Sequence, residues 1–561
     1  MFIEKKTKYK IQKDFSTIEL TEIKEGTNNF DNFIIFKNNN IIDIYDRRCD
    51  HAGGKILSTK NHHTCPYHNW KFSPETGRYN NGLEKKKLKF KITNKKIIIE
   101  NKKFIPQLNF IKSKKSVSIE YINHAFLIIE GDGFKFATDP WALGPAFGLG
   151  WWLKNKTKRN WLKELQSCDF IYISHNHPDH LHQLSLSLLK KDKQIVVPNF
   201  KSNSVSKFLE SMNFKNIKKI DFLKHFNFKK TDLNFMILKS GDFKDDSGLY
   251  FTAGNTSFLL AVDSNNLNSH NLPNIDLYAA SFAGGASGFP LIFDNYSEKQ
   301  KVKILSKNKL LFKTIRLKEI HLTSTKYFLP YAGSFLEKLD RNSYIKKNNQ
   351  KNSVDDYIDI NNKFKTLDIN KNNIFEFFDG KLLSQKNIKY PVLNDLDEKK
   401  YEANFQNIYT KITKKSLNNY FLKSKFHDNL ILFISLMNVD YTKSFFNLSI
   451  NFTKKTTKVK FYKTEITKDI LRKQYKKDSP NLLFISVRLE SFINILINMD
   501  SWENLVIGFE CKIFRLPNIY NAKFWHHFSN VYVKDKSQKK GIDCYSCERL
   551  NQRIFNQILN I

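Results

Sequence analysis

Cys49-Asp50-His51 is followed, after thirteen further residues, by Cys65-Pro66-Tyr67-His68. Each segment offers one thiolate and one imidazole, and together they provide four ligands of the kinds that iron and zinc accept. Gly53 and Gly54 follow the first segment and Pro66 stiffens the second, as in loops that wrap closely around a metal group. The stretch therefore predicts a small domain of short strands that holds a metal centre between two loops.

The pairing of one Cys with one His in each loop is typical of a Rieske [2Fe–2S] centre. In such a centre two thiolates hold one iron and two imidazoles hold the other. A zinc site with the same ligands is the alternative, but zinc sites usually group Cys with Cys and His with His. We therefore interpret Cys49, His51, Cys65 and His68 as cluster ligands and expect the chain to transfer electrons.

A second group of ligand-type residues follows the apolar run 170–173, in the sequence Ser174-His175-Asn176-His177-Pro178-Asp179-His180. This H-x-H-x-D-H sequence at the end of a strand resembles the signature of the metallo-β-lactamase superfamily. In that superfamily the first two His, here His175 and His177, serve one metal site and the Asp179–His180 pair serves the other. Asp263, which ends the apolar run 258–262, matches the metal-bridging Asp. The resemblance implies an αββα sandwich.

Two histidines of the superfamily's hydrolases have no counterpart in this chain. No His lies near Asp242, where those hydrolases place a third His, and Tyr331 stands where their closing His would be. The remaining candidate ligands are His175, His177, Asp179, His180, Asp242 and Asp263. Two His and one carboxylate with open positions favour non-haem iron and O₂ activation, and the number of metals at this site is left open.

Further blocks rich in Gly and aromatic residues lie outside the two metal motifs. They comprise residues 138–147, 150–152, 281–290, 507–510, 518–520 and 524–528. Together with residues 49–68 and 171–180, these blocks resemble the family of cytidine monophosphate-N-acetylneuraminate hydroxylases along nearly the whole chain. In the animal members a His takes the place of Phe243, so the ligand set of the second site is left open.

The resemblance implies an iron-dependent monooxygenase that converts the N-acetyl group of the activated sialic acid into N-glycolyl. It also implies that O₂ is consumed and that electrons come from an external carrier. That carrier is expected to be a ferredoxin or a cytochrome b5-like protein, served by its NAD(P)H reductase.

Three alternatives are kept. The hydroxylase acts on a different N-acyl sugar, or the chain is a metal-dependent hydrolase with the Rieske domain as a redox sensor, or it is an electron carrier without catalysis. The Gly-rich loop 283–288 has two interpretations as well. Its backbone N–H groups could hold an anionic sugar nucleotide, or its glycines could permit tight packing.

Composition indicates a multidomain enzyme. A chain of 561 residues exceeds a single core and indicates three or four domains. The formal net charge of +37 is spread over the whole chain without a basic helix, so we do not expect nucleic-acid binding. Six Cys, of which Cys544 and Cys547 form an isolated CxxC pair, do not make a disulfide framework. No apolar run approaches the length of a membrane span, and we expect a cytoplasmic protein.

The motifs divide the chain into four segments. We expect an all-β Rieske domain over 1–112, a metallo-β-lactamase-like αββα sandwich over 113–345, a linker or surface excursion over 346–375, and a small α+β domain over 376–561. In this last domain, which resembles sterol-carrier-type domains, the patterns predict strands over 445–452 and 505–509 and a helix over 489–496.

Overall fold

The computed structural model describes residues 2–5, 8–50, 55–59, 62–65, 70–80, 83–107, 112–240, 245–264, 267, 275–360, 363–393, 397–454, 456–476 and 478–534. Four residues of interest from the sequence lie outside the described residues: His51, His68, Asp242 and Phe243. The CxxC pair of Cys544 and Cys547 also lies outside them. Within the described part of the chain, no helix is long and apolar enough to cross a membrane.

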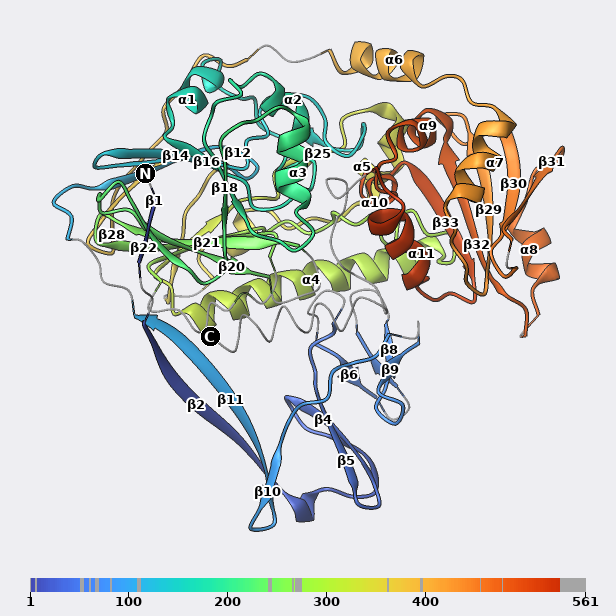
Figure 1. The fold of residues 1–561 in the computed structure, drawn as a ribbon, viewed down its shortest axis with the longest axis horizontal. Coiled ribbons are helices and arrows are strands. Elements are labelled where there is room, and N and C mark those ends of the chain that lie inside the picture. The colour runs from blue at the N-terminus through green and yellow to red at the C-terminus, as the bar shows by residue number, and fades with distance from the viewer. Residues whose placement is uncertain are drawn as a thin grey trace.

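The N-terminal region consists of three small antiparallel sheets. A long ribbon of β2 (Lys8–Glu19) and β11 (Lys96–Gln107), extended by β10 (Lys91–Thr93), connects the sandwich described below to two smaller sheets (Figure 1). One of these contains β3 (Gly26–Asn29), β4 (Phe33–Asn38) and β5 (Ile41–Asp46). The other contains β6 (Leu57–Ser58), β7 (His63–Thr64), β8 (Lys71–Ser73) and β9 (Arg78–Tyr79). These short strands place the two Cys-bearing segments at adjoining loops.

The middle of the chain forms two eight-stranded sheets packed face to face. In spatial order the first sheet contains β1 (Phe2–Lys5), β19 (His225–Phe228), β20 (Asn234–Lys239), β21 (Ser247–Ala253), β22 (Thr256–Val262), β23 (Leu277–Ala280), β24 (Tyr327–Pro330) and β26 (Lys365–Thr366). The second contains β18 (Ile217–Ile220), β17 (Ile195–Pro198), β16 (Phe170–Tyr172), β14 (Phe134–Thr138), β13 (Phe126–Gly131), β12 (Val117–Asn123), β27 (Ile374–Phe378) and β28 (Lys381–Lys386). Strands such as β22 are buried on both faces and therefore read as continuous apolar runs.

Helices cover both outer faces of this sandwich. On one side lie α1 (Trp161–Ser167), α2 (Gln183–Ser187) and α3 (Ser204–Ser211), whose apolar side chains share a buried cluster with β14, β16 and β17. On the other side runs the long α4 (Glu298–Thr323), which begins with a capping box between Ser297 and Gln300 (Figure 1). The αββα arrangement expected from the sequence is confirmed.

Two segments outside the expected sandwich range of 113–345 take part in its sheets. The N-terminal β1 pairs antiparallel with β19, and Phe2 packs against Phe170, Phe228 and Phe235 with ring centroids 5.3, 5.3 and 5.9 Å away. The segment 365–386 supplies β26, β27 and β28. The domain limits given above stay a prediction, with these two segments as additions to the sandwich.

The C-terminal region is an α+β unit with one five-stranded sheet. Its spatial order is β31 (Lys458–Tyr462), β30 (Ser444–Asn451), β29 (Leu430–Met437), β32 (Asn481–Arg488) and β33 (Cys511–Leu516). Its helices are α7 (Lys414–Lys423), α8 (Lys468–Gln474), α9 (Leu489–Asn498), α10 (Glu503–Ile507) and α11 (Ala522–His526). Outside the two large sheets, β15 (Trp152–Leu153), which follows β14, pairs with β25 (Phe335–Leu336), which follows β24. The helix α5 (Ser343–Asn348) precedes β26, and α6 (Glu398–Ile408) follows β28.

Two of the three elements predicted here are present, and one prediction is wrong. Residues 445–452 match β30 and residues 489–496 match α9. Residues 505–509 were expected to be a strand, but Glu503–Ile507 is a short helix and the next strand begins at Cys511. The chain turns here through backbone hydrogen bonds from Asn504 N to Ser501 O and from Leu505 N to Trp502 O, both 3.1 Å, and Leu505 and Phe509 pack in a buried cluster.

Candidate metal centres

The loop after β16 brings two imidazoles together. Nε2 of His175 lies 2.8 Å from Nδ1 of His177, and both rings are buried. Asp263, which directly follows β22 in the facing sheet, completes a group whose three ligand atoms lie within 4.8 Å of one another. Because two histidines and a carboxylate converge on one point, this group can hold a metal ion.

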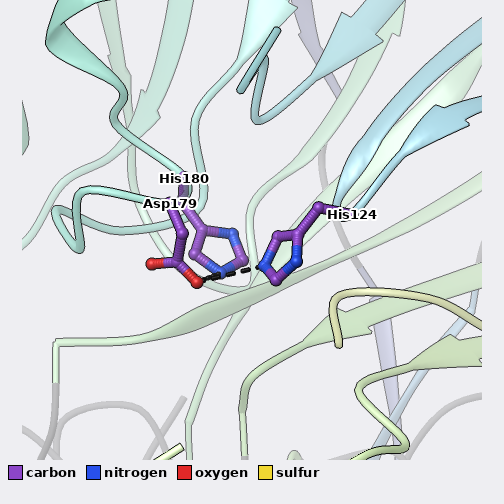
Figure 2. A group of neighbouring side chains, drawn as sticks. All are labelled: His124, Asp179 and His180. Atoms are coloured by element: carbon purple, nitrogen blue, oxygen red, sulfur yellow. Dashed lines mark hydrogen bonds and ion pairs between the residues drawn. The ribbon is translucent and has the colours of Figure 1, made fainter. Parts of the chain in front are cut away.

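A second group lies beside the first and contains His124, Asp179 and His180 (Figure 2). Oδ2 of Asp179 is 3.0 Å from Nε2 of His124 and 3.4 Å from Nε2 of His180. Oδ2 of Asp263 is also 3.4 Å from Nε2 of His180, so this carboxylate lies between the two groups. Its place is consistent with the bridging position expected for Asp263.

Two candidate ligands were not found by sequence reasoning. His124 follows β12 in a tight turn with a φ of +42°, although the sequence over 121–129 predicts one continuous strand. Asp246 is buried, and its Oδ1 lies 3.9 Å from Nε2 of His175. A His within the apolar run 121–129 and a third Asp after β20 were the available signals. Asp242, the residue that the sequence favoured in this region, lies outside the described residues.

Asp139 and Ser174 orient the histidine rings from behind. The buried Asp139 carboxylate accepts hydrogen bonds from Ser174 N at 2.7 Å and Ser174 Oγ at 2.6 Å, and lies 3.0 Å from Nδ1 of His180. Ser174 Oγ is 3.0 Å from Nδ1 of His175. Hydrogen bonds of this kind at the outward nitrogen fix the orientation and tautomer of metal-binding histidines.

Several buried polar atoms of the two groups make no hydrogen bond within the part of the chain that the structure describes. They are Nδ1 of His124, Nε2 of His177, Nε2 of His180 and Oδ1 of Asp179. A buried polar atom without a partner costs about 1–3 kcal/mol, so such a concentration in one site calls for a ligand. Imidazole and carboxylate donors at these separations fit iron or another first-row metal ion.

Neighbouring groups in the second ligand group shift the pKa values of Asp179 and His180. Burial would by itself raise the pKa of Asp179, but His180 and His124 outweigh it and hold that pKa well below its ordinary value. Burial would lower the pKa of His180, yet Asp179 and Asp263 raise it well above its ordinary value. A cation that binds to His180 therefore competes with a proton whose binding Asp179 and Asp263 favour.

The N-terminal region buries its two cysteines in one apolar cluster. Cys49 and Cys65 are 1% and 2% exposed and share this cluster with Trp70, Tyr79 and neighbouring residues. Lys85 is buried beside the first Cys loop, 2.8 Å from Asp46 and 3.4 Å from Asp50, and Tyr79 OH donates to Asp50 at 3.0 Å. This framework holds the loop of Cys49, and the roles of His51 and His68 stay predictions.

The C-terminal region touches both centres. Tyr520 packs on Trp70 with a centroid distance of 5.4 Å, and Ala522 belongs to the same buried cluster as the two cysteines. At the other centre, Oε2 of Glu503 at the start of α10 lies 3.9 Å from Nε2 of His177. These contacts place α10 and α11 beside the two candidate metal-binding regions.

Packing explains two glycines of the loop 283–288. Gly285 has a φ of +74°, and a Cβ there would lie 2.9 Å from Oδ1 of Asn349. At Gly288, with a φ of +65°, a Cβ would lie 2.7 Å from the carbonyl oxygen of Val506. Both positions combine a left-handed backbone with close contact, which a larger residue cannot tolerate.

Comparison with known proteins identifies both halves of this arrangement. The family model of the Rieske [2Fe–2S] domain matches residues 6–91, and that of a β-lactamase superfamily domain matches residues 118–266. The solved diiron β-hydroxylase CmlA from Streptomyces venezuelae is 17% identical, with a TM-score of 0.28 over 42% of this chain and 50% of its own.

Curated relatives extend the similarity over most of the chain. Cytidine monophosphate-N-acetylneuraminic acid hydroxylase from Gorilla gorilla gorilla is 25% identical over 91% of each chain, and that from Xenopus laevis is 26% identical over 91% of this chain and 92% of its own. The protein of that name from Asterias rubens is 30% identical over 56% of this chain and 52% of its own. The chain thus combines a Rieske domain and a metallo-β-lactamase-like domain in one polypeptide, and it is similar over most of its length to cytidine monophosphate-N-acetylneuraminic acid hydroxylases.

Proposed function

We propose that this protein is an iron-dependent monooxygenase that hydroxylates the N-acetyl methyl group of CMP-N-acetylneuraminate. In this reaction one atom of O₂ enters a methyl C–H bond to give CH₂OH. The other atom leaves as water with two electrons and two protons. The observation that carries the proposal is the combination, in one chain, of a Rieske domain and a histidine–carboxylate site that fits iron.

Each of the two ligand groups can hold a metal ion. His175, His177 and Asp263 would hold iron, and His124, Asp179 and His180 offer a second position. Non-haem iron bound in such a site supplies the redox chemistry that O₂ activation needs. Asp139 and Ser174 keep the rings of His180 and His175 turned toward the ligand groups.

Aromatic side chains shield His124 and His177 from water, whereas the Asp263 side chain is 32% exposed. The ring of His124 lies 5.2 Å from Trp141 and 6.5 Å from Trp151, and the ring of His177 lies 5.9 Å from Phe147, all between centroids. These aromatic residues are buried. Exclusion of bulk water protects a reactive centre from side reactions and strengthens the electrostatic contacts inside it.

The partners follow from the reaction. Each turnover requires two electrons, which we propose are supplied through the Rieske cluster by a ferredoxin or cytochrome b5-like protein with its NAD(P)H reductase, in the cytoplasm. The net charge of +37 supports an acidic donor and an anionic sugar nucleotide, because opposite charge accelerates encounter.

Oxygen labelling tests the proposal directly. Reduced holoprotein is incubated with CMP-N-acetylneuraminate under ¹⁸O₂, and the product is analysed by mass spectrometry. We expect one ¹⁸O atom in the N-acyl group, and no label when ¹⁸O is supplied only as water. Cleavage of the substrate without incorporation of ¹⁸O from O₂ would support the hydrolase alternative, and hydroxylation of another N-acyl sugar in preference would change the substrate.

A further inference from the structure

Each histidine of the metal loop has one ring nitrogen that faces the ligand groups and one that faces away. For His175 the outward nitrogen is Nδ1, 3.0 Å from Ser174 Oγ, and for His180 it is Nδ1, 3.0 Å from Asp139 Oδ2. A neutral imidazole that binds a metal through one nitrogen carries its proton on the other, and that N–H needs an acceptor. The rings of His175 and His180 both have such an acceptor.

His177 is turned the other way round. Its Nδ1 lies 2.8 Å from Nε2 of His175, so this nitrogen faces the first ligand group and Nε2 faces outward. Nε2 is buried and makes no hydrogen bond to any residue that the structure describes. The carboxylate within ion-pair distance of it is that of Glu503, with Oε2 3.9 Å away.

Glu503 belongs to the C-terminal region, and its place is fixed by the docking of α10 on the sandwich. Trp151 Nε1 donates a hydrogen bond to the carbonyl oxygen of Ile507 at 2.9 Å. Backbones also meet at Gly150 and Gly508, since a Cβ on Gly150 would lie 2.3 Å from the Gly508 carbonyl oxygen. Glycine at both positions therefore lets α10 come close to the metal loop.

We propose that Glu503 is a positioning residue of the metal centre, which accepts a hydrogen bond from Nε2–H of His177 and so leaves Nδ1 unprotonated for the metal. The separation of 3.9 Å exceeds an N–H···O hydrogen bond by about 1 Å. The Glu503 side chain is 32% exposed, so a rotation toward His177 can close that gap. The C-terminal region thus completes a site whose metal ligands lie in the sandwich.

The inference rests on the iron site of the proposed function but not on its substrate. A direct test measures the affinity of the second site for Co(II) alone, in full-length protein that retains its Rieske cluster and has been cleared of other metal by chelation. Loss of a hydrogen-bonding partner of a metal-binding His typically costs 10–100-fold in metal affinity. We expect Glu503→Ala to weaken Co(II) binding by about that factor, and Glu503→Gln, which keeps an acceptor oxygen, to stay within a few-fold of the parent.

Two controls separate positioning from folding. Asp500→Asn removes a carboxylate near the same helix, where Asp500 accepts a hydrogen bond from Asn504 at 2.7 Å, and should leave Co(II) affinity unchanged. In a His177→Ala background, Glu503→Ala should weaken Co(II) binding no further, because the hydrogen bond has already been removed.

Three outcomes would overturn the inference. Glu503→Ala could bind Co(II) as tightly as the parent, or it could lower only the thermal unfolding temperature of the metal-free protein. If Glu503→Gln instead loses as much affinity as Glu503→Ala, the carboxylate is a metal ligand and not a positioning residue. None of these results depends on hydroxylation, so none of them tests or contradicts the proposed substrate.

Discussion

Both ring nitrogens of His175 lie within hydrogen-bonding distance of another side chain. Nδ1 faces Ser174 and Nε2 faces the ligand group, so replacement by Ala removes a candidate ligand without disturbing the distant cysteine loops. We expect His175→Ala to abolish ¹⁸O incorporation while reduced protein keeps its Rieske-type electron paramagnetic resonance signal. Retained turnover in this variant would place the oxygenase centre elsewhere.

Asp139 provides a second test at the residue scale. Asp139→Asn keeps the size of the side chain but removes the charge that faces Nδ1 of His180. We expect about a 10–100-fold loss of metal affinity at the second ligand group, because an amide has one acceptor oxygen and cannot serve both Ser174 N and the side chains of Ser174 and His180 as the two carboxylate oxygens do. Iron content after dialysis against a graded chelator measures the loss. Unchanged iron retention would show that Ser174 and the surrounding packing suffice to hold the ring.

The Rieske ligands yield a spectroscopic prediction. Exchanging one imidazole ligand for a thiolate lowers the reduction potential of the cluster and changes its magnetic signal. Reduced His68→Cys protein should therefore lose or alter the signal of the parent. Zinc in stoichiometric amount without acid-labile sulfide in the parent would instead identify Cys49, His51, Cys65 and His68 as a zinc site.

The candidate ligands differ in how far the sequence could predict them. His175, His177, Asp179 and His180 lie within six residues of one another, so a local pattern brings them to attention, and the structure places them together with Asp263. His124 was expected to lie within a strand over 121–129, because nothing in the local sequence indicates the turn or the loop that its ring faces. Glu503 reaches His177 only through the docking of one domain on another, which no local pattern encodes.

At the scale of elements, a buried ionic network joins the connection after β25 to α9 and β33. Arg341, whose side chain is fully buried, lies 2.5 Å from Glu490 and 2.9 Å from Glu510, and Arg488 lies 3.1 Å from Glu510. Ser491 Oγ donates to the same carboxylate at 2.9 Å. Removing one partner of such a network leaves the others buried without compensation, at a cost of about 3–5 kcal/mol.

Glu510 gives this network a dependence on pH. Burial would raise the pKa of Glu510, but Arg341 and Arg488 outweigh it and hold the pKa below the ordinary value of 4.5. Its contribution to stability is therefore fully present above pH 4.5 and is lost as the pH falls through the lowered pKa. Glu510→Gln should lower the urea midpoint at neutral pH and show less further loss on acidification than the parent. Parallel pH profiles for both proteins would contradict this account.

Helices and strands could be predicted from the sequence where one hydrophobic pattern dominated. The amphipathic run 489–496 became α9 and the apolar run 258–262 became β22, because burial and local preference agree there. The segment 505–509 is apolar enough for a strand, but its conformation is set by the packing of Leu505 and Phe509 in a buried cluster shared by the sandwich and the C-terminal region. Tertiary packing therefore determined the conformation of residues 505–509.

At the scale of the whole molecule, the C-terminal region connects the two centres. Tyr520 packs on Trp70, Phe524 lies 5.4 Å from Trp502 between ring centroids, and Glu503 follows Trp502 directly. These contacts place the C-terminal region beside both the cysteine cluster and His177, and we expect electrons to pass between the two centres within one polypeptide.

Tyr520→Ala tests that connection. We expect a slower reoxidation of the reduced Rieske cluster by O₂ in the presence of substrate, with cluster content and second-site iron unchanged. Stopped-flow absorption of the cluster measures the rate, and Phe445→Ala, which alters an exposed aromatic residue on β30, serves as the control. An unchanged rate would mean that the electrons follow another route, such as one between two chains.

The pairing of β1 with β19 has a consequence for how the protein is made. Residue 5 is synthesised 220 residues before its partner residue 225, which at about 5–20 residues per second is a wait of roughly 10–45 s on the ribosome. The Rieske segment is completed during that interval, and when β19 emerges its partner strand is already available to cover it. An exposed sheet edge favours aggregation, so changes in β1 should reduce the yield of soluble protein from cells before they affect either metal centre.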